Sequence, residues 1–204
     1  MPNASTIRRQ IAGVQQLTIA SILGTVVTTT ETVFQLNNNG LTLTGGGFIP
    51  LSAGVTGLYQ GTGQVLWIHA TGTLTATTAN VATLILKLYE TPAANLPFPA
   101  PPAETSAIVI AASNLVGLSV AGTLGAGATN GSFQFDAFVQ LDSQGNLEGY
   151  YQANVFGTTT PRTAITPITG LVGEADLNFL LTATQGVAEI GNIVTLDEFS
   201  LNFV

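Results

Sequence analysis

The stretch from Ser132 to Phe156 constrains the fold more than any other segment, because it has the pattern of a β-hairpin. Apolar and polar residues alternate on both sides of a turn at residues 142–146, whose sequence Asp-Ser-Gln-Gly-Asn suits a chain reversal. Period-two alternation indicates strands with one buried face. We therefore predict two antiparallel strands here, with Phe135 on the buried face of the first.

Two further segments alternate in the same way. Residues 64–76 and 80–90 are each expected to form a strand with one apolar face. Only residues 77–79 separate them, so we predict that these two strands are neighbours in one sheet.

The remaining segments are shorter or less regular. Residues 107–112 are predicted to form a short apolar strand, and residues 157–170 a long exposed loop with two prolines. In the last strand, residues 192–204, the apolar face changes phase, which predicts a β-bulge near Asp197 and Glu198.

About eight to ten strands at this spacing, with no helical pattern between them, predict an all-β fold. Glycine-rich turns between long strands favour an antiparallel β-sandwich of the jelly-roll type. We assign this domain to residues 31–204 and an N-terminal arm to residues 1–30.

The arm mixes helical spacing with β-branched residues and carries no charge from Gln10 to Thr30. It is predicted either to pack on a partner or to form the first strand of the domain. The candidate partner-binding residues are Ile7, Arg8, Arg9, Ile11, Val14 and Leu17.

The chain is unusually poor in charge. Charged residues make up 7% of it, against about 25% in an average globular domain. A mean hydropathy of +0.44 adds to the expectation that much of the surface is buried against other subunits, in a symmetric homo-oligomer and most simply a trimer.

The kinds of charged and reactive residues exclude several classes of function. Four basic residues against eleven acidic ones argue against nucleic-acid binding. The absence of cysteine excludes disulfides and cysteine-based metal sites. No secretory signal and no membrane span are recognisable, so we expect a protein made in the cytoplasm of its host cell, without a membrane partner.

Candidate catalytic residues are few. His69 is the only histidine, and no nucleophile elbow accompanies it, so a packed or interfacial histidine is the preferred interpretation. Asp136 and Glu148 lie on the polar faces of the two hairpin strands, where a glycosidase-like carboxylate pair is conceivable. Alternation alone places polar residues there, so no catalytic residue, cofactor or enzyme activity is expected.

Two binding functions were also considered. Acidic residues could supply oxygen ligands for calcium at Asp197–Glu198, at Glu174 and Asp176, or in the turn at residues 142–146, but none has the spacing of a known calcium loop. No metal site is therefore predicted. A set of aromatic residues could form a sugar-stacking surface: Tyr59, Trp67, Tyr89, Tyr150 and Tyr151.

The chain resembles bacteriophage virion proteins of the jelly-roll type, particularly capsid decoration (cement) proteins. The features that carry the resemblance are the uncharged arm, the run Gly-Phe-Ile-Pro-Leu-Ser-Ala-Gly at 47–54, the segments 64–76 and 80–90, and the closing run from Val194 to Phe203. The resemblance covers most of the chain but rests on the general pattern of these segments. It therefore implies no specific binding residue.

The resemblance implies a homotrimer that stands on the outer surface of a virion and clamps neighbouring copies of the major capsid protein. It implies no enzyme activity and no cofactor. Two alternatives remain at this point: a receptor- or glycan-binding module of a phage tail fibre, and a glycosidase-like enzyme.

Overall fold

The computed structural model describes residues 21–22, 29–34, 48–50, 65–77, 79–91, 110–142, 144–171, 178–187 and 191–203. Within these ranges the regular elements are β-strands, apart from one helical turn that includes Ile110 and Ala111. Every strand pair is antiparallel, so the all-β prediction is confirmed. The strands are β1 (Ser21–Ile22), β2 (Thr32–Val33), β3 (Phe48–Pro50), β4 (Leu66–Thr75), β5 (Ala82–Thr91), β6 (Asn114–Leu118), β7 (Gly122–Leu124), β8 (Gly131–Leu141), β9 (Leu147–Val155), β10 (Thr158–Ala164), β11 (Asn178–Gln185) and β12 (Ile193–Phe203).

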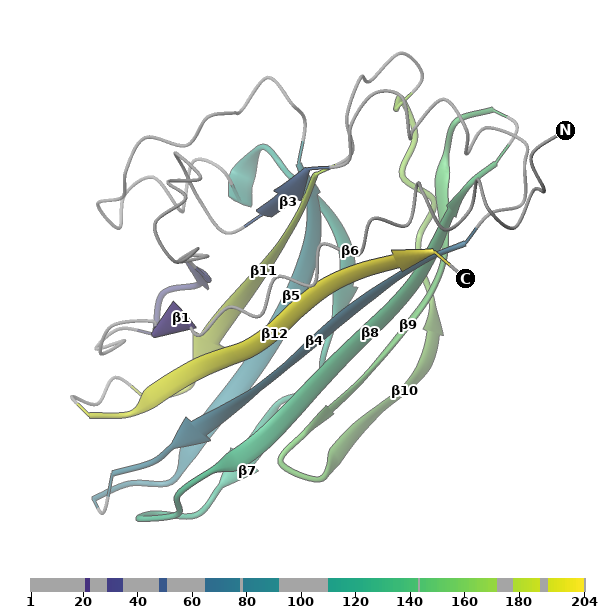
Figure 1. Cartoon of the computed structure of the whole chain (residues 1–204). Helices are drawn as coiled ribbons and strands as arrows, with labels where there is room; N and C mark the ends of the chain where they lie inside the picture. Colours follow the sequence, from purple (N-terminus) through teal and green to yellow (C-terminus); the bar gives the residue numbers. More distant parts are fainter. Residues whose placement is uncertain are drawn as a thin grey trace, which may run out of the picture.

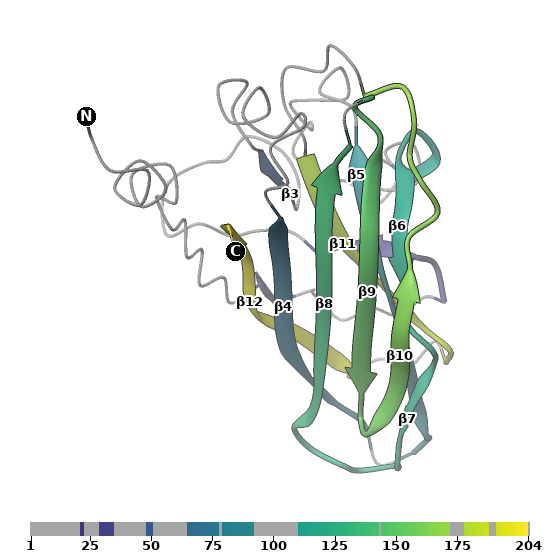
Figure 2. The same cartoon turned by 90° about the vertical axis from the view of Figure 1, so that its right-hand side faces the viewer.

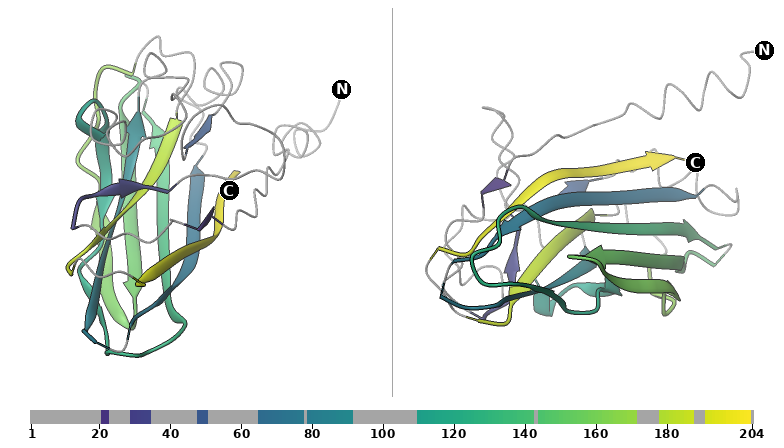
Figure 3. Two further views of the ribbon diagram at one scale, coloured as in Figure 1. Left: turned by 90° about the vertical axis from the view of Figure 1, so that its left-hand side faces the viewer. Right: turned by 90° about the horizontal axis from the view of Figure 1, so that it is seen from below.

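The strands form two sheets (Figures 1 and 2). The first sheet has the order β1-β12-β4-β8-β9-β10, and the second has the order β2-β11-β5-β6. The short strand β3 pairs with β11, and β7 pairs with β5. The view from below in Figure 3 shows the strands of the second sheet crossing behind those of the first.

The pairings between distant strands are nested inside one another. The first strand, β1, pairs with the last, β12, and β2 pairs with β11. Further inside, β4 pairs with β8 and β5 pairs with β6. Successive nested pairs alternate between the two sheets, and β9 and β10 extend the first sheet beyond β8.

The inner faces of both sheets contribute to a single apolar core. Phe34, which follows β2, and Phe133 of β8 have ring centroids 6.2 Å apart, so they link the sheets directly. A Cβ atom at Gly117 of β6 would lie 2.7 Å from the Tyr151 ring and 2.9 Å from that of Phe135. The close approach of β6 to the first sheet therefore requires glycine at this position.

The predicted hairpin is confirmed. β8 and β9 pair from Phe133 opposite Val155 to Leu141 opposite Leu147, and Phe135 is 1% exposed, as expected. In the turn, Asp142 Oδ1 accepts hydrogen bonds from the backbone N–H groups of Gln144 and Asn146. These bonds, with those from Asn146 first in importance, lower the pKa of Asp142.

The neighbour relation predicted for residues 64–76 and 80–90 is wrong. Both segments form strands with the expected buried faces, but β4 lies in the first sheet and β5 in the second. Alternation specifies which face of a strand is buried, and it contains no information about the partner strand. The short connection crosses between the sheets where a hairpin turn was expected.

Two other local predictions also need correction. Within residues 157–170, Thr158–Ala164 form the edge strand β10, and Ile165 and Ile168 are buried, so this segment is no exposed loop. The loop was predicted partly because of Pro161, but proline is tolerated on edge strands.

Of residues 107–112, the described part holds the helical turn at Ile110, and the strand begins later, at Asn114. The bulge in the last strand is confirmed, because the register of β12 against β4 shifts between Leu196 and Glu198.

Candidate functional site

Polar and aromatic side chains are aligned in rows across the outer face of the first sheet. The register of β4, β8 and β9 places residues of the same kind opposite one another. The three rows are Trp67–Phe138–Tyr150, His69–Asp136–Gln152 and Thr71–Gln134–Asn154.

The first row is an aromatic ladder. The rings of Trp67 and Phe138 are nearly parallel, with centroids 6.0 Å apart, and those of Phe138 and Tyr150 are 4.9 Å apart. Arg162 of β10 closes the row, with its guanidinium carbon 3.5 Å from the centroid of the Tyr150 ring. This cation–π contact places the guanidinium over the face of the Tyr150 ring.

The second row is centred on the carboxylate of Asp136, which is 4% exposed. Asp136 Oδ1 accepts a hydrogen bond from Trp67 Nε1 at 2.8 Å and lies 2.7 Å from His69 Nδ1. Asp136 Oδ2 accepts a hydrogen bond from Gln134 Nε2 at 2.6 Å. The carboxylate is thus fixed in one orientation by three neighbours.

This network shifts the pKa values of both ionisable partners. Burial would raise the pKa of Asp136, but the bonds from His69, Trp67 and Gln134 outweigh it and lower that pKa. The hydrogen bond to Asp136 is also the main reason why the pKa of His69 is raised above 6.5. The packed histidine preferred from the sequence matches this geometry, because His69 also contacts the Trp67 ring.

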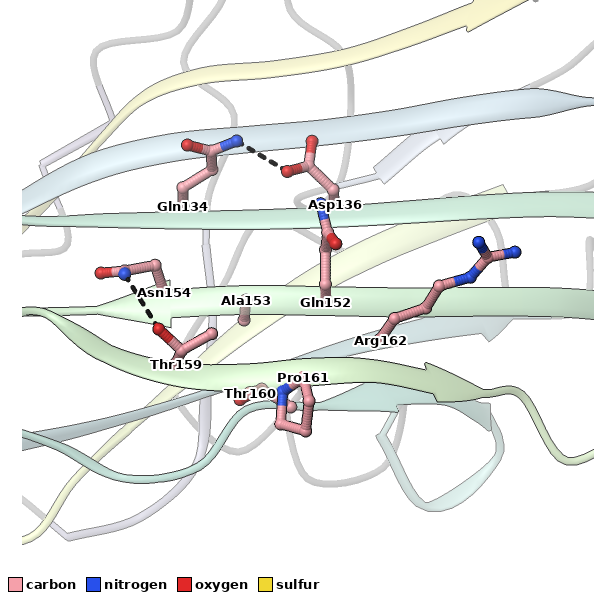
Figure 4. A pocket seen from close by; sticks show the side chains of 9 residues that line it. All are labelled: Gln134, Asp136, Gln152, Ala153, Asn154, Thr159, Thr160, Pro161 and Arg162. Carbon is pink, nitrogen blue, oxygen red and sulfur yellow. Dashed lines mark hydrogen bonds between the residues drawn. The ribbon is translucent and has the colours of Figure 1, made fainter.

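A groove of about 330 Å³ lies beside this network, across β9 (Figure 4). Asp136 and Gln134 line one side, Gln152 and Asn154 lie along its middle, and the β10 residues line the other side. The residues from β10 are Thr159, Thr160, Pro161 and Arg162. Its volume is within the range of small-molecule sites.

A β-bulge in β10 positions Arg162 at this groove. Thr160 lies opposite Ala153 and Thr163 opposite Tyr151, so Pro161 and Arg162 together face the single residue Gln152. Strict alternation would place residue 162 on the inner face with the buried Thr160. The extra residue instead turns Arg162 outward, which is a common use of bulges near functional sites.

The register keeps the candidate carboxylate pair apart. Glu148 lies opposite Gln140, whose amide donates a hydrogen bond to it, four residues along β8 from Asp136. At about 3.3 Å per residue the two carboxylates are separated by about 13 Å along the strand. Glycosidase pairs are at most about 9.5 Å apart, so this pair does not form a glycosidase site.

The calcium candidates do not converge either. No group of three or more metal-ligating side chains occurs in the described ranges. Both carboxylate oxygens of Asp142 accept hydrogen bonds within the turn, and Glu198 accepts one from Ser200. Glu174 and Asp176 lie outside the described residues.

The five aromatic residues considered for sugar stacking are not brought together. Trp67 and Tyr150 share the ladder, Tyr151 stacks on Phe135 on the inner side, and Tyr89 belongs to the second sheet. Tyr59 lies outside the described residues. In the ladder Phe138 stacks between Trp67 and Tyr150, and Arg162 lies over the Tyr150 ring, so these ring faces are not open to a sugar ring.

The candidate arm residues, from Ile7 to Leu17, lie outside the described part of the chain. Within the segment assigned to the arm, Ser21–Ile22 form β1 and pair with β12. Just after it, Glu31 contacts the outer face of the second sheet, where its carboxylate bonds to Lys87, Tyr89 and Thr182 at 2.6, 2.9 and 2.5 Å.

Gln152, Arg162 and Phe138 were not predicted as site residues from the sequence. Gln152 and Phe138 were recognised only as outward-facing positions of the hairpin. Arg162 was assigned to a loop. The β-branched run Thr158–Thr160 just after the hairpin was a signal for a third strand that could have placed Arg162 beside it.

No known family model matches the sequence, and no curated protein matches it. Across the described segments, no helix has the length and apolar character needed to cross a bilayer.

Proposed function

We propose that the chain is a jelly-roll β-sandwich that acts as a structural interaction protein of a bacteriophage virion, as a decoration protein on the outer surface of the capsid. The observation that carries this proposal is the nested strand pairing. A jelly roll is a long doubled hairpin rolled up so that its first and last strands pair and successive pairs alternate between two sheets. The pairs β1–β12, β2–β11, β4–β8 and β5–β6 follow that order.

The surface supports burial in an assembly. The chain has few charges, and three large apolar side chains are exposed on and just after the edge strand β6: Leu115, Leu118 and Val120, at 45%, 39% and 48%. Exposed apolar residues beside an unpaired strand edge are typical of contact surfaces between chains. We propose a homotrimer whose partners are copies of itself and the major capsid protein.

The proposed role requires no catalysis and no cofactor. The N-terminal residues would supply the capsid contact, because Arg8 and Arg9 can bind carboxylates bidentately and apolar residues follow them. Since β1 begins at Ser21, a truncation that removes residues 1–20 leaves the described strands complete.

The test uses full-length and truncated protein mixed with undecorated capsids, which are then pelleted. Full-length protein is expected to sediment with the capsids, and protein without residues 1–20 to stay in the supernatant while keeping its thermal unfolding transition. A monomer in light scattering at high micromolar concentration would contradict the trimer. Absence of full-length protein from the pellet would contradict the capsid role.

The alternative, a receptor-binding module of a tail fibre, is compatible with the same fold. The groove on the outer face favours it, because a decoration role alone does not require a shaped polar site. A fibre module would not sediment with isolated capsids, so the same experiment separates the two functions.

A further inference from the structure

The groove across β9 contains polar groups whose hydrogen-bonding capacity is unused. In the described part of the chain, the side-chain amide of Gln152 has no hydrogen-bond partner. Arg162 forms no ion pair there either, whereas Lys87 is paired with Glu31. Arg162 therefore offers a positive charge on the β10 side of the groove. The Asp136 carboxylate on the opposite side already bonds to Trp67, His69 and Gln134.

Two of the groups around the groove, Arg162 and Asn154, are held in place before any ligand arrives. Tyr150 supports the guanidinium of Arg162 from one side, so its N–H groups remain available at the edge. Asn154 Oδ1 accepts the backbone N–H of Gly157, which fixes its amide and leaves Nδ2 with only a 3.4 Å contact to Thr159. Fixed donors reduce the entropy lost on binding.

These groups favour a ligand that is rich in hydroxyls and carries one carboxylate. Amides donate and accept, so they suit hydroxyl groups, whereas the planar guanidinium suits a carboxylate. We propose that the groove binds an acidic saccharide unit, such as a uronic or sialic acid, with its hydroxyls on Gln152 and Asn154 and its carboxylate on Arg162. The proposal depends on the groove alone and not on the capsid role.

Two other ligand classes fit less well. A nucleic acid would bring many phosphates to a chain of net charge −7, and Arg162 is isolated from other cations in the described structure. A peptide strand added to the edge strand β10 would meet Pro161, which has no N–H group, and the bulge at that position.

The test begins with full-length protein on an array of neutral, uronate-containing and sialylated glycans. The best ligand is then titrated by calorimetry against the wild type, Gln152→Ala, Arg162→Gln and Arg162→Lys. The matched control is Gln144→Ala, which removes an exposed glutamine side chain at the hairpin turn, outside the groove. Thermal unfolding monitored by circular dichroism shows whether each variant is folded.

We expect acidic glycans to bind at least tenfold more tightly than their neutral counterparts. Arg162→Gln should abolish that preference, Arg162→Lys should retain only part of it, and Gln152→Ala should weaken all glycans about tenfold, the effect of one or two hydrogen bonds. Gln144→Ala should bind as the wild type does.

Three results would overturn the proposal: no glycan bound at millimolar concentration, an equal preference for neutral glycans, or unchanged affinity in folded Gln152→Ala and Arg162→Gln. Capsid binding by the same variants is a separate readout, so failure of the groove proposal is distinguishable from failure of the capsid proposal.

Discussion

Two carboxylates, Asp136 on the first sheet and Glu31 on the second, accept several hydrogen bonds on opposite outer faces of the molecule. Both have a lowered pKa because the bonds from their neighbours outweigh burial. The surroundings differ. Glu31 bonds to groups on β5 and β11, including the ammonium group of Lys87. Within the described residues, Asp136 borders a groove beside an amide without a hydrogen-bond partner, on Gln152, and an arginine without an ion pair, Arg162.

This difference separates a structural carboxylate from one at a candidate site. Glu31 and Thr182 are 151 positions apart in the sequence, so their hydrogen bond ties the segment before β2 to the second sheet. The pKa of Tyr89 is raised, first by the burial of its own side chain and then by its hydrogen bond to Glu31. The polar groups around Glu31 form hydrogen bonds with one another, and such a network stabilises the fold. The network around Asp136 lies next to polar groups that are still free to form hydrogen bonds, so it can also take part in binding a ligand.

The largest expected effect on stability comes from truncating a core side chain beneath Asp136. Phe135 precedes Asp136 on β8 and is buried between the sheets. Phe135→Ala should lower the free energy of unfolding by about 3–5 kcal/mol, measured by urea denaturation, because a large cavity remains. A change within about 0.5 kcal/mol, which is typical of surface sites, would contradict this packing.

Next in size is the loss of the Glu31 network. Glu31→Ala should destabilise the protein by about 1–3 kcal/mol, because three donors lose a charged acceptor, one of them on the buried Thr182. Glu31→Ala should leave the affinity for glycans unchanged. Weakened glycan binding in a folded Glu31→Ala protein would contradict the assignment of a purely structural role.

Asp136→Asn should have a smaller effect that depends on pH. The raised pKa of His69 means that its contribution to stability is fully present below about pH 6.5, its unfolded value, and is lost as pH rises through the folded pKa. We expect the variant to lose up to about 1–2 kcal/mol between about pH 4 and pH 6.5, where Asp136 is ionised and His69 is protonated in the native protein, and less above the folded pKa of His69.

NMR titration measures the pKa of His69 directly, because it is the only histidine. In Asp136→Asn that pKa should fall towards 6.5, since the carboxylate that stabilises the imidazolium is gone. An unchanged pKa would show that Asp136 and His69 do not interact in solution.

The smallest expected effect on stability is that of Arg162→Gln. The exposed cation–π contact with Tyr150 is worth about 0.5–1 kcal/mol, so the loss should be within that range in urea denaturation. Of the variants discussed, Arg162→Gln should change the stability least and the affinity for acidic glycans most. A loss above about 2 kcal/mol would indicate a structural role for Arg162 instead.

The sequence by itself determined the strands with strong alternation and the faces they bury. Phe135 was assigned to a buried face because apolar residues recur at every second position, a property of the local chain. Leu66 and Leu84, on the apolar faces of the other two alternating segments, are buried for the same reason. The phase change in the last strand located its bulge for the same reason. The edge strand β10 has weaker alternation and contains Pro161, so this rule failed there.

Only the tertiary structure decided which strands are partners, and with them the candidate site. Trp67 and His69 meet Asp136 across 69 and 67 positions of sequence because β4 pairs with β8 and not with β5. Arg162 reaches Tyr150 because the bulge in β10 adds one residue opposite Gln152. Alternation is local to each strand, whereas pairing and register depend on the packing of the whole chain around one core.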